Sequence, residues 1–300
     1  MKKIFLLLIV ASISANAQTA GRSGLSFLKL GFGARNVAMS DLGVIGANDL
    51  TALNYNPSLL AVDQKTQLSF THNSLFDGLA SEMFAGSFQL FGLPFAVGVN
   101  TTTINDIEVR TKPGDAESTF GAHYFYASLS TGFNISENIF AGGTIKYLYE
   151  NIFSDDATGL GFDIGASYKN VIENLSVGAS IRNFGSMNNL RNEATKLPAD
   201  LRLGAEYKFE MPESKFNVIA IGGLQKYTDT DDTHFHIGAE VTYNNIFSLR
   251  GGYVTGYDSK NLSAGFGVLW KNINLDYAYT PVNYSLGDYH IISIMYTFNN

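Results

Sequence analysis

From about residue 66 to the C-terminus, apolar and polar side chains alternate with a period of two. In residues 139–150, Ile139, Ile145 and Tyr147 lie on one face, whereas Lys146 and Glu150 lie on the other. Three further segments, residues 160–169, 201–209 and 234–243, repeat this alternation. Such a pattern predicts β-strands that have one apolar and one polar face.

We predict about 14 strands of this kind. Most are about ten residues long or longer, which matches a tilted membrane-spanning strand and exceeds the usual globular strand. The predicted ranges are 66–76, 82–91, 94–104, 120–133, 138–151, 157–170, 174–184, 200–210, 215–226, 233–243, 246–256, 260–270, 272–281 and 288–298.

The predicted connections alternate between tight turns and longer loops. Those after the even-numbered strands are tight, whereas those after the third and seventh strands are the long segments Asn105–Thr119 and Gly185–Ala199. Outer-membrane barrels combine short periplasmic turns, longer outer loops and an even number of strands. This layout also places both chain ends in the periplasm.

A sheet with an apolar exterior and a charged interior closes only in lipid. We therefore predict an all-β fold, a transmembrane antiparallel β-barrel of the outer membrane, over residues 66–300. The charges of mixed sign that would face its lumen predict ion pairing rather than a strongly ion-selective pore. These are Lys146, Glu150, Asp163, Arg202, Glu206, Glu240, Arg250 and Asp276.

The N-terminus has the features of a secretory signal peptide. Lys2 and Lys3 precede a mostly apolar run, which is followed by the A-x-A site Ala15-Asn16-Ala17. We assign residues 1–17 to the signal peptide, with cleavage after Ala17. The signal peptide and the strand pattern together predict that the protein is located in the bacterial outer membrane, where lipid surrounds the barrel. The alternative is a soluble periplasmic β-protein.

Composition narrows the function further. The 300 residues include no Cys, so no disulfide framework stabilises this exported chain. The formal net charge of -7 argues against a nucleic-acid partner, which would need a basic patch.

Candidate catalytic and metal sites are weak. His234 and His236 are two residues apart on one strand face, a spacing that can offer two metal ligands, but no third ligand is evident. We therefore interpret them as polar lumen residues. The acidic segment 228–232 lacks the glycine and distal glutamate of a calcium loop. We predict no enzymatic activity, no metal and no cofactor.

Residues 18–65 do not alternate cleanly and are predicted to form a plug inside the barrel. Asn56 can cap a helix, and Pro57 suits its first position, so a short helix is predicted from Pro57 to Val62.

Several segments of this region resemble the N-terminal signature of PorV/PorQ-type proteins, within the FadL-like superfamily of outer-membrane barrels. They are Phe27-Leu28-Lys29-Leu30, Gly33-Ala34-Arg35, Ala38-Met39, Tyr55-Asn56-Pro57 and Leu60-Ala61. The resemblance implies a fourteen-strand barrel with an N-terminal plug. It also implies a non-enzymatic role in type IX protein secretion, in which the rim loops Asn105–Thr119 and Gly185–Ala199 bind cargo carrying a C-terminal signal domain, or other secretion components. The chain departs from the family pattern at Ser58-Leu59 and Asn48-Asp49-Leu50.

The alternative hypothesis is a FadL-like channel for hydrophobic small molecules, with the plug as its gate. It predicts an apolar pocket between plug and wall, lined by residues such as Leu28, Phe32 and Leu59, and a kinked strand that opens sideways into lipid. A third possibility is a structural barrel without a ligand.

Overall fold

The computed structural model describes residues 24–47, 49–75, 78–211, 213–230, 232–284 and 287–298. The predicted signal peptide and its cleavage site at Ala17 lie outside these residues.

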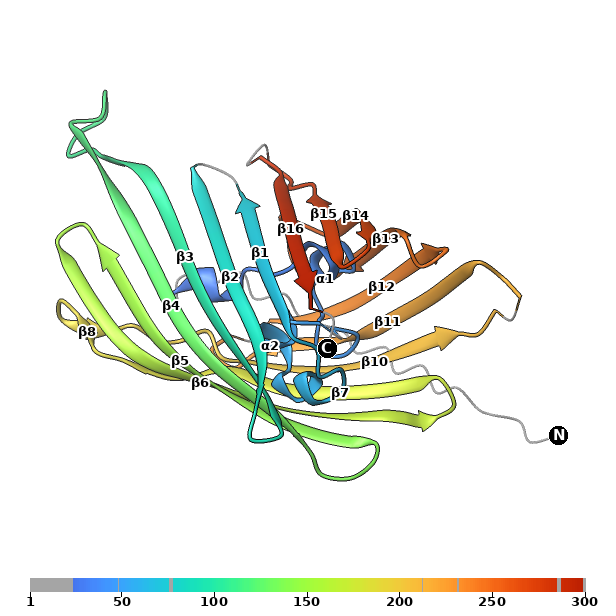
Figure 1. The fold of residues 1–300 in the computed structure, drawn as a ribbon. Coiled ribbons are helices and arrows are strands. Elements are labelled where there is room, and N and C mark those ends of the chain that lie inside the picture. The colour runs from blue at the N-terminus through green and yellow to red at the C-terminus, as the bar shows by residue number, and fades with distance from the viewer. Residues whose placement is uncertain are drawn as a thin grey trace.

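The described residues form a closed antiparallel barrel of 14 strands, which confirms the predicted fold class (Figure 1). Each strand pairs with its neighbour in sequence, and β1 pairs with β16 to close the barrel. The barrel strands are β1 (Gln67–Ser74), β2 (Leu79–Leu90), β3 (Leu93–Val109), β4 (Ser118–Asn134), β5 (Ile139–Ile152), β6 (Asp155–Ile172), β7 (Leu175–Met187), β10 (Asp200–Phe209), β11 (Phe216–Tyr227), β12 (Thr233–Tyr243), β13 (Phe247–Val254), β14 (Leu262–Trp270), β15 (Ile273–Thr280) and β16 (Tyr289–Thr297).

The wall is apolar on its outside and polar on its inside. The outward side chain of Leu249 is 69% exposed, whereas the inward side chain of Arg202 is 1% exposed. This distribution is the reverse of a water-soluble protein, and lipid is the medium in which an exposed apolar band is stable.

The two ends of the barrel differ in their connections. At one end, which we call the outer end, the connections are residues 75–78, 110–117, 153–154, 188–199, 228–232, 255–261 and 281–288. At the other, the inner end, they are residues 91–92, 135–138, 173–174, 210–215, 244–246 and 271–272. β1 begins and β16 ends at the inner end, where the predicted tight turns lie.

Both long loops are shorter than predicted. β3 and β4 extend into the expected loop Asn105–Thr119 and leave residues 110–117 as the connection. Their pairing passes a register shift between Ile104 and Ile107, which interrupts the period-two pattern that marks a strand. In the expected loop Gly185–Ala199, β7 continues to Met187, and a small hairpin of β8 (Asn189–Leu190) and β9 (Glu193–Ala194) follows.

The segment before β1 lies inside the barrel, and we call its described residues 24–47 and 49–65 the plug (Figure 1). It contains η1 (Ser26–Lys29), α1 (Ala34–Ala38), α2 (Ala52–Tyr55) and η2 (Pro57–Ala61). The helix expected after Asn56 is present as η2, and the Asn56 side chain accepts a hydrogen bond from the Ser58 N–H. No helix of the described residues has both the length and the apolar character needed to cross a membrane.

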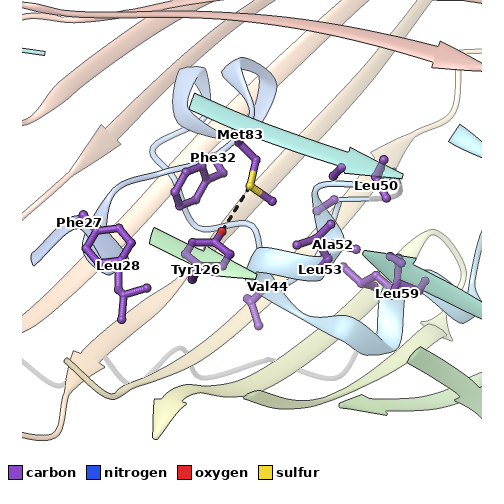
Figure 2. Packing of buried hydrophobic residues seen from close by; sticks show 14 of the residues in the cluster. Phe27, Leu28, Phe32, Val44, Leu50, Ala52, Leu53, Leu59, Met83 and Tyr126 are labelled. Atoms are coloured by element: carbon purple, nitrogen blue, oxygen red, sulfur yellow. Dashed lines mark hydrogen bonds between the residues drawn. The ribbon is translucent and has the colours of Figure 1, made fainter. Parts of the chain in front are cut away.

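The largest apolar cluster joins the plug to the inner wall (Figure 2). Phe27 and Phe32 of the plug pack around Tyr126 of β4, with ring centroids 6.1 Å away in each case. The Tyr126 hydroxyl donates to Asn54 Oδ1 at 2.7 Å. The described lumen is therefore filled by a packed core at this level.

Candidate functional site

Glycines of the barrel wall let the plug approach the sheet closely. A Cβ atom added at Gly142 would lie 2.5 Å from Pro57 and Ser58 backbone atoms, and one added at Gly165 would lie 2.0 Å from Asn56 Oδ1. The inner surface of β5 and β6 is therefore complementary to the Asn56-Pro57-Ser58 turn, because these glycines leave room for it.

Asn56 uses both polar atoms of its side chain, and one of its hydrogen bonds joins the plug to the wall. Its amide nitrogen donates to the carbonyl oxygens of Val44 at 2.8 Å and Ala166 at 3.1 Å. Its Oδ1 accepts from Ser58 N–H at 3.2 Å and from Ser58 Oγ at 2.7 Å. Asn56 is fully buried, so each of these bonds replaces one to water.

Tyr55 holds the plug together next to a cluster of barrel cations. Its hydroxyl donates to Asp41 Oδ1 and accepts from the Phe32 N–H at 2.9 Å. The guanidinium carbons of Arg182 and Arg202 lie 5.7 and 5.4 Å from the ring centroid. Burial, and then the Asp41 carboxylate, raise the pKa of Tyr55 well above its ordinary value, so the hydroxyl stays a donor.

Arg35 anchors α1 to β12. Its Nε donates to Glu240 Oε2 at 2.9 Å, and its Nη2 donates to Glu240 Oε1 at 2.8 Å. Its Nη1 donates to the Gly46 carbonyl at 2.6 Å, which ties the guanidinium to the plug as well. Burial by itself lowers the pKa of Arg35, but the Glu240 carboxylate outweighs it and raises that pKa, so Arg35 stays charged.

Gly33 and Ala34 set the start of α1. Gly33 has φ +87°, a left-handed conformation that favours glycine, and an added Cβ would lie 2.6 Å from Thr51. The Ala34 N–H donates to Ser293 Oγ of β16 at 2.9 Å. The plug residues singled out in the sequence therefore all lie at packed contacts.

The charges predicted to face the lumen are all buried inside the barrel, and most pair as close neighbours. Lys146 pairs with Asp163 at 2.7 Å, and Arg250 pairs with both Glu240 and Asp276 at 2.5 Å. Arg202 pairs with Asp200 at 2.9 Å, and Glu206 with Lys169 at 3.3 Å. Glu150 instead accepts a hydrogen bond from the Thr195 hydroxyl.

Sequence reasoning missed four members of these networks. Asp200 is the first residue of β10 and lies opposite Arg182, which is in the middle of β7. Lys169 lies among the last four residues of β6. Arg35 has no periodic signal because it belongs to the plug.

His234 and His236 are both buried lumen residues. His234 stacks on Tyr257 with a centroid distance of 3.7 Å, and His236 Nδ1 lies 2.5 Å from the Ser40 carbonyl oxygen. Among the residues that the structure describes, no group of three or more His, Cys, Asp or Glu side chains is placed to hold a metal ion. Asp231, in the acidic segment 228–232, lies outside the described residues.

A cavity of about 580 Å³ lies at the outer end, between η1 and the ends of the strands. We call it the outer cavity. Its wall is mainly apolar and aromatic, with Phe27, Leu30, Leu79 and Tyr124 among the contributors. A volume of this size suits a small organic ligand.

The residues expected to line the pocket are not on the wall of the outer cavity. Leu28, Phe32 and Leu59 are at most 5% exposed and belong to the packed core. The prediction was wrong for Leu28 because η1 turns Phe27 and Lys29 towards the outer cavity instead, and for Phe32 and Leu59 because both pack in the core.

A second hollow, of about 480 Å³, lies at the inner end and is polar. Arg35, Lys65, Glu240 and Lys271 are on its wall. We call it the inner vestibule. The outer cavity and the inner vestibule share no lining residue, and the plug lies between them.

The wall itself is irregular at β6 and β7. Arg182 and Asn183 together oppose Asp163, which shifts the register there. On the outside of this region, a hollow of about 590 Å³ surrounds Gly143. The kinked strand that opens sideways into lipid stays a prediction.

The fold is similar to that of solved channels. The Pseudomonas putida toluene transporter TodX aligns with TM-score 0.65 and 13% identity over 90% of this chain and 99% of that chain. The CymD monoaromatic hydrocarbon channel aligns with TM-score 0.63 and 14% identity over 90% and 98%. A Pseudomonas aeruginosa FadL homologue aligns with TM-score 0.54 and 12% identity over 89% and 98%.

These similarities show a FadL-like fold, a closed antiparallel β-barrel of 14 strands. In sequence, residues 94–195 match the model of a family described as "Family of unknown function (DUF5723)". No curated protein matches the chain.

Proposed function

We propose that the protein is a non-enzymatic, FadL-like channel of the outer membrane that binds and admits hydrophobic small molecules. The outer cavity carries the proposal, because it combines an apolar and aromatic wall with a volume of about 580 Å³. The similarity to TodX, a toluene transporter, and to CymD, a monoaromatic hydrocarbon channel, supports it.

In this proposal the plug is the gate. The outer cavity opens towards the outer end, and the plug with its packed core separates it from the inner vestibule. A ligand bound in the outer cavity therefore enters only when the plug, or the wall beside it, moves.

Binding of a neutral fluorophore, N-phenyl-1-naphthylamine, to the purified detergent-solubilised barrel tests the cavity. Ser26 is exposed on η1 and lines the cavity, so Ser26→Trp fills it. We expect this variant to lose most of the binding. The control is Ser136→Trp, in an exposed turn at the inner end, which leaves the cavity unchanged. Equal binding by both variants contradicts the proposal.

The PorV/PorQ resemblance supports a second candidate, a non-enzymatic role in type IX protein secretion through bound cargo or partner proteins. The observation that favours it is the arm formed by β3, β4 and residues 110–117, which projects at the outer end (Figure 1). Replacing residues 110–117 by a short turn should abolish capture of cargo with a C-terminal signal domain. Unchanged capture by a correctly assembled barrel contradicts this role.

A further inference from the structure

Two lysines on the wall of the outer cavity lie over tyrosine rings. The Lys29 ammonium lies over the Tyr227 ring, 4.5 Å from its centroid, and the Lys260 ammonium lies over the Tyr257 and Tyr289 rings at 5.0 and 5.5 Å. Within the part of the chain that the structure describes, neither ammonium forms an ion pair, although the Asp41 carboxylate acts on Lys260 at longer range.

The two lysines belong to one continuous arrangement. Tyr227 and Tyr257 share a side-chain hydrogen bond, so Lys29, Tyr227, Tyr257 and Lys260 follow one another along the cavity wall. They come from three separate parts of the chain, namely η1, β11 and the β13–β14 connection, which holds both Tyr257 and Lys260. The closed barrel brings them together.

The charges on the wall of the outer cavity do not balance. Among its described lining residues, Lys29 and Lys260 are basic and Glu150 is the one acid. The Glu150 carboxylate already accepts a hydrogen bond from the Thr195 hydroxyl. One positive charge is left over, which a ligand with a single negative charge would neutralise.

The wall of the outer cavity carries five aromatic rings in addition to aliphatic side chains such as Leu30. Phe27 and Tyr124 stack with centroids 5.2 Å apart, and Tyr227, Tyr257 and Tyr289 complete the ring-bearing side. Aromatic side chains bind a planar ring in stacked or edge contact, and this contact adds binding free energy beyond that of the buried area alone.

Burial also makes the Lys260 charge costly in the empty protein. Burial lowers the pKa of Lys260, and the nearby Asp41 carboxylate only partly opposes this effect. An anion in the cavity would supply the missing partner and stabilise the charged form.

We propose that the outer cavity selects an aromatic acid, a planar ring system with one carboxylate, and that Lys260 and Lys29 bind the carboxylate while the tyrosines contact the ring. This proposal rests on the proposed small-molecule function and names its ligand class. In this proposal the charge of the ligand, and not only its size and apolar surface, determines which ligand binds.

Three probes of similar size test it by isothermal titration with the purified barrel. They are 2-naphthoate, neutral 2-methylnaphthalene and the alkyl acid decanoate. We expect 2-naphthoate to bind most tightly, by about tenfold or more over 2-methylnaphthalene, because a charge-assisted hydrogen bond distinguishes them.

The variants separate charge from packing. Lys260→Met and Lys29→Met should each weaken 2-naphthoate about tenfold and leave 2-methylnaphthalene unchanged, which also shows that the cavity is intact. Glu150→Gln should strengthen 2-naphthoate. The control, Lys112→Met, removes an exposed lysine of the 110–117 connection and should change neither probe.

The outcomes are distinguishable. If the wild-type barrel binds none of the three probes, the proposed small-molecule function itself is overturned. If 2-methylnaphthalene binds as tightly as 2-naphthoate, or if Lys260→Met leaves 2-naphthoate unchanged, small-molecule binding stands and the charge selection is overturned. If decanoate binds as tightly as 2-naphthoate, the aromatic preference is overturned.

Discussion

Arg35 of α1 and Glu240 of β12, 205 positions apart, form a two-pronged ion pair with N–O distances of 2.8 and 2.9 Å. Glu240 also accepts from Arg250, which in turn reaches Asp276. One plug guanidinium thus joins the plug to a charge network on the inner face of the barrel, at the edge of the inner vestibule.

Arg35→Met should loosen the plug. It removes both bonds to Glu240 and the bond to Gly46, and losing one partner of a buried pair costs about 3 kcal/mol. We expect larger and more frequent current steps in planar bilayers, together with a lower unfolding temperature of the barrel. Arg35→Lys keeps the charge but not the forked geometry, so its currents should be intermediate. Wild-type currents in Arg35→Met would show that the ion pair does not hold the plug.

Asn56→Asp should detach the turn before η2 from the wall. The new side chain keeps the oxygen that caps η2 but can no longer donate to the Val44 and Ala166 carbonyls. Each buried carbonyl left unpaired costs about 1–3 kcal/mol. We expect faster protease cleavage within the plug, with the barrel still heat-modifiable on gels. Ser136→Asp, in the exposed inner turn 135–138, is the control and should behave as the wild type. Equal cleavage rates in both variants would contradict the role given to Asn56.

The sequence predicted the wall far better than the contents of the lumen. Lipid outside and charge inside impose the period of two on every barrel strand, so alternation located the fourteen strands and the inward charges such as Lys146 and Asp163. The period fades where Ile104 and Ile107 span a register shift, which is why the ends of β3 and β4 beyond them were predicted as part of a loop.

The plug shows a different limit. Its helices are four or five residues long, too short for a helical period, and Asn56-Pro57 was recognisable only as a capping pair. The wall of the outer cavity depends on which way η1 turns its side chains and on a tyrosine and a lysine in the β13–β14 connection. No local pattern links Lys29 to Lys260, because only the closure of the barrel brings them together.

Gly142→Ala should push the plug off the wall. An added methyl group would lie 2.5 Å from the Pro57 and Ser58 backbone, where neither neighbour is a flexible side chain. We expect a loss of about 1–3 kcal/mol in the free energy of unfolding in lipid, because overpacking forces backbone shifts. Gly251→Ala is the matched control, since nothing lies within 4 Å of its added Cβ. If both variants unfold like the wild type, the close approach of plug and wall contributes nothing to stability.

Binding of 2-naphthoate should depend on pH through Lys260. In the empty protein, burial lowers the pKa of Lys260; the other charged groups that act on it are Asp41, which opposes this, and Arg202, which adds to it. A bound carboxylate favours the charged amine, so it raises that pKa, and binding takes up protons at alkaline pH. Affinity should therefore stay level from about pH 6 and fall as the pH passes the depressed pKa of Lys260, before the ordinary lysine value of about 10.4.

Titration calorimetry in two buffers of different ionisation enthalpy measures both the affinity and the protons taken up. Lys29 and Glu150 also face the outer cavity, so the decisive comparison is with Lys260→Met. This variant should lose the proton uptake and show a flatter profile, because the amine that titrates is gone. Lys112→Met should retain the wild-type profile. A fall in affinity that persists unchanged in Lys260→Met would assign the titration to another group and remove Lys260 from the anion site.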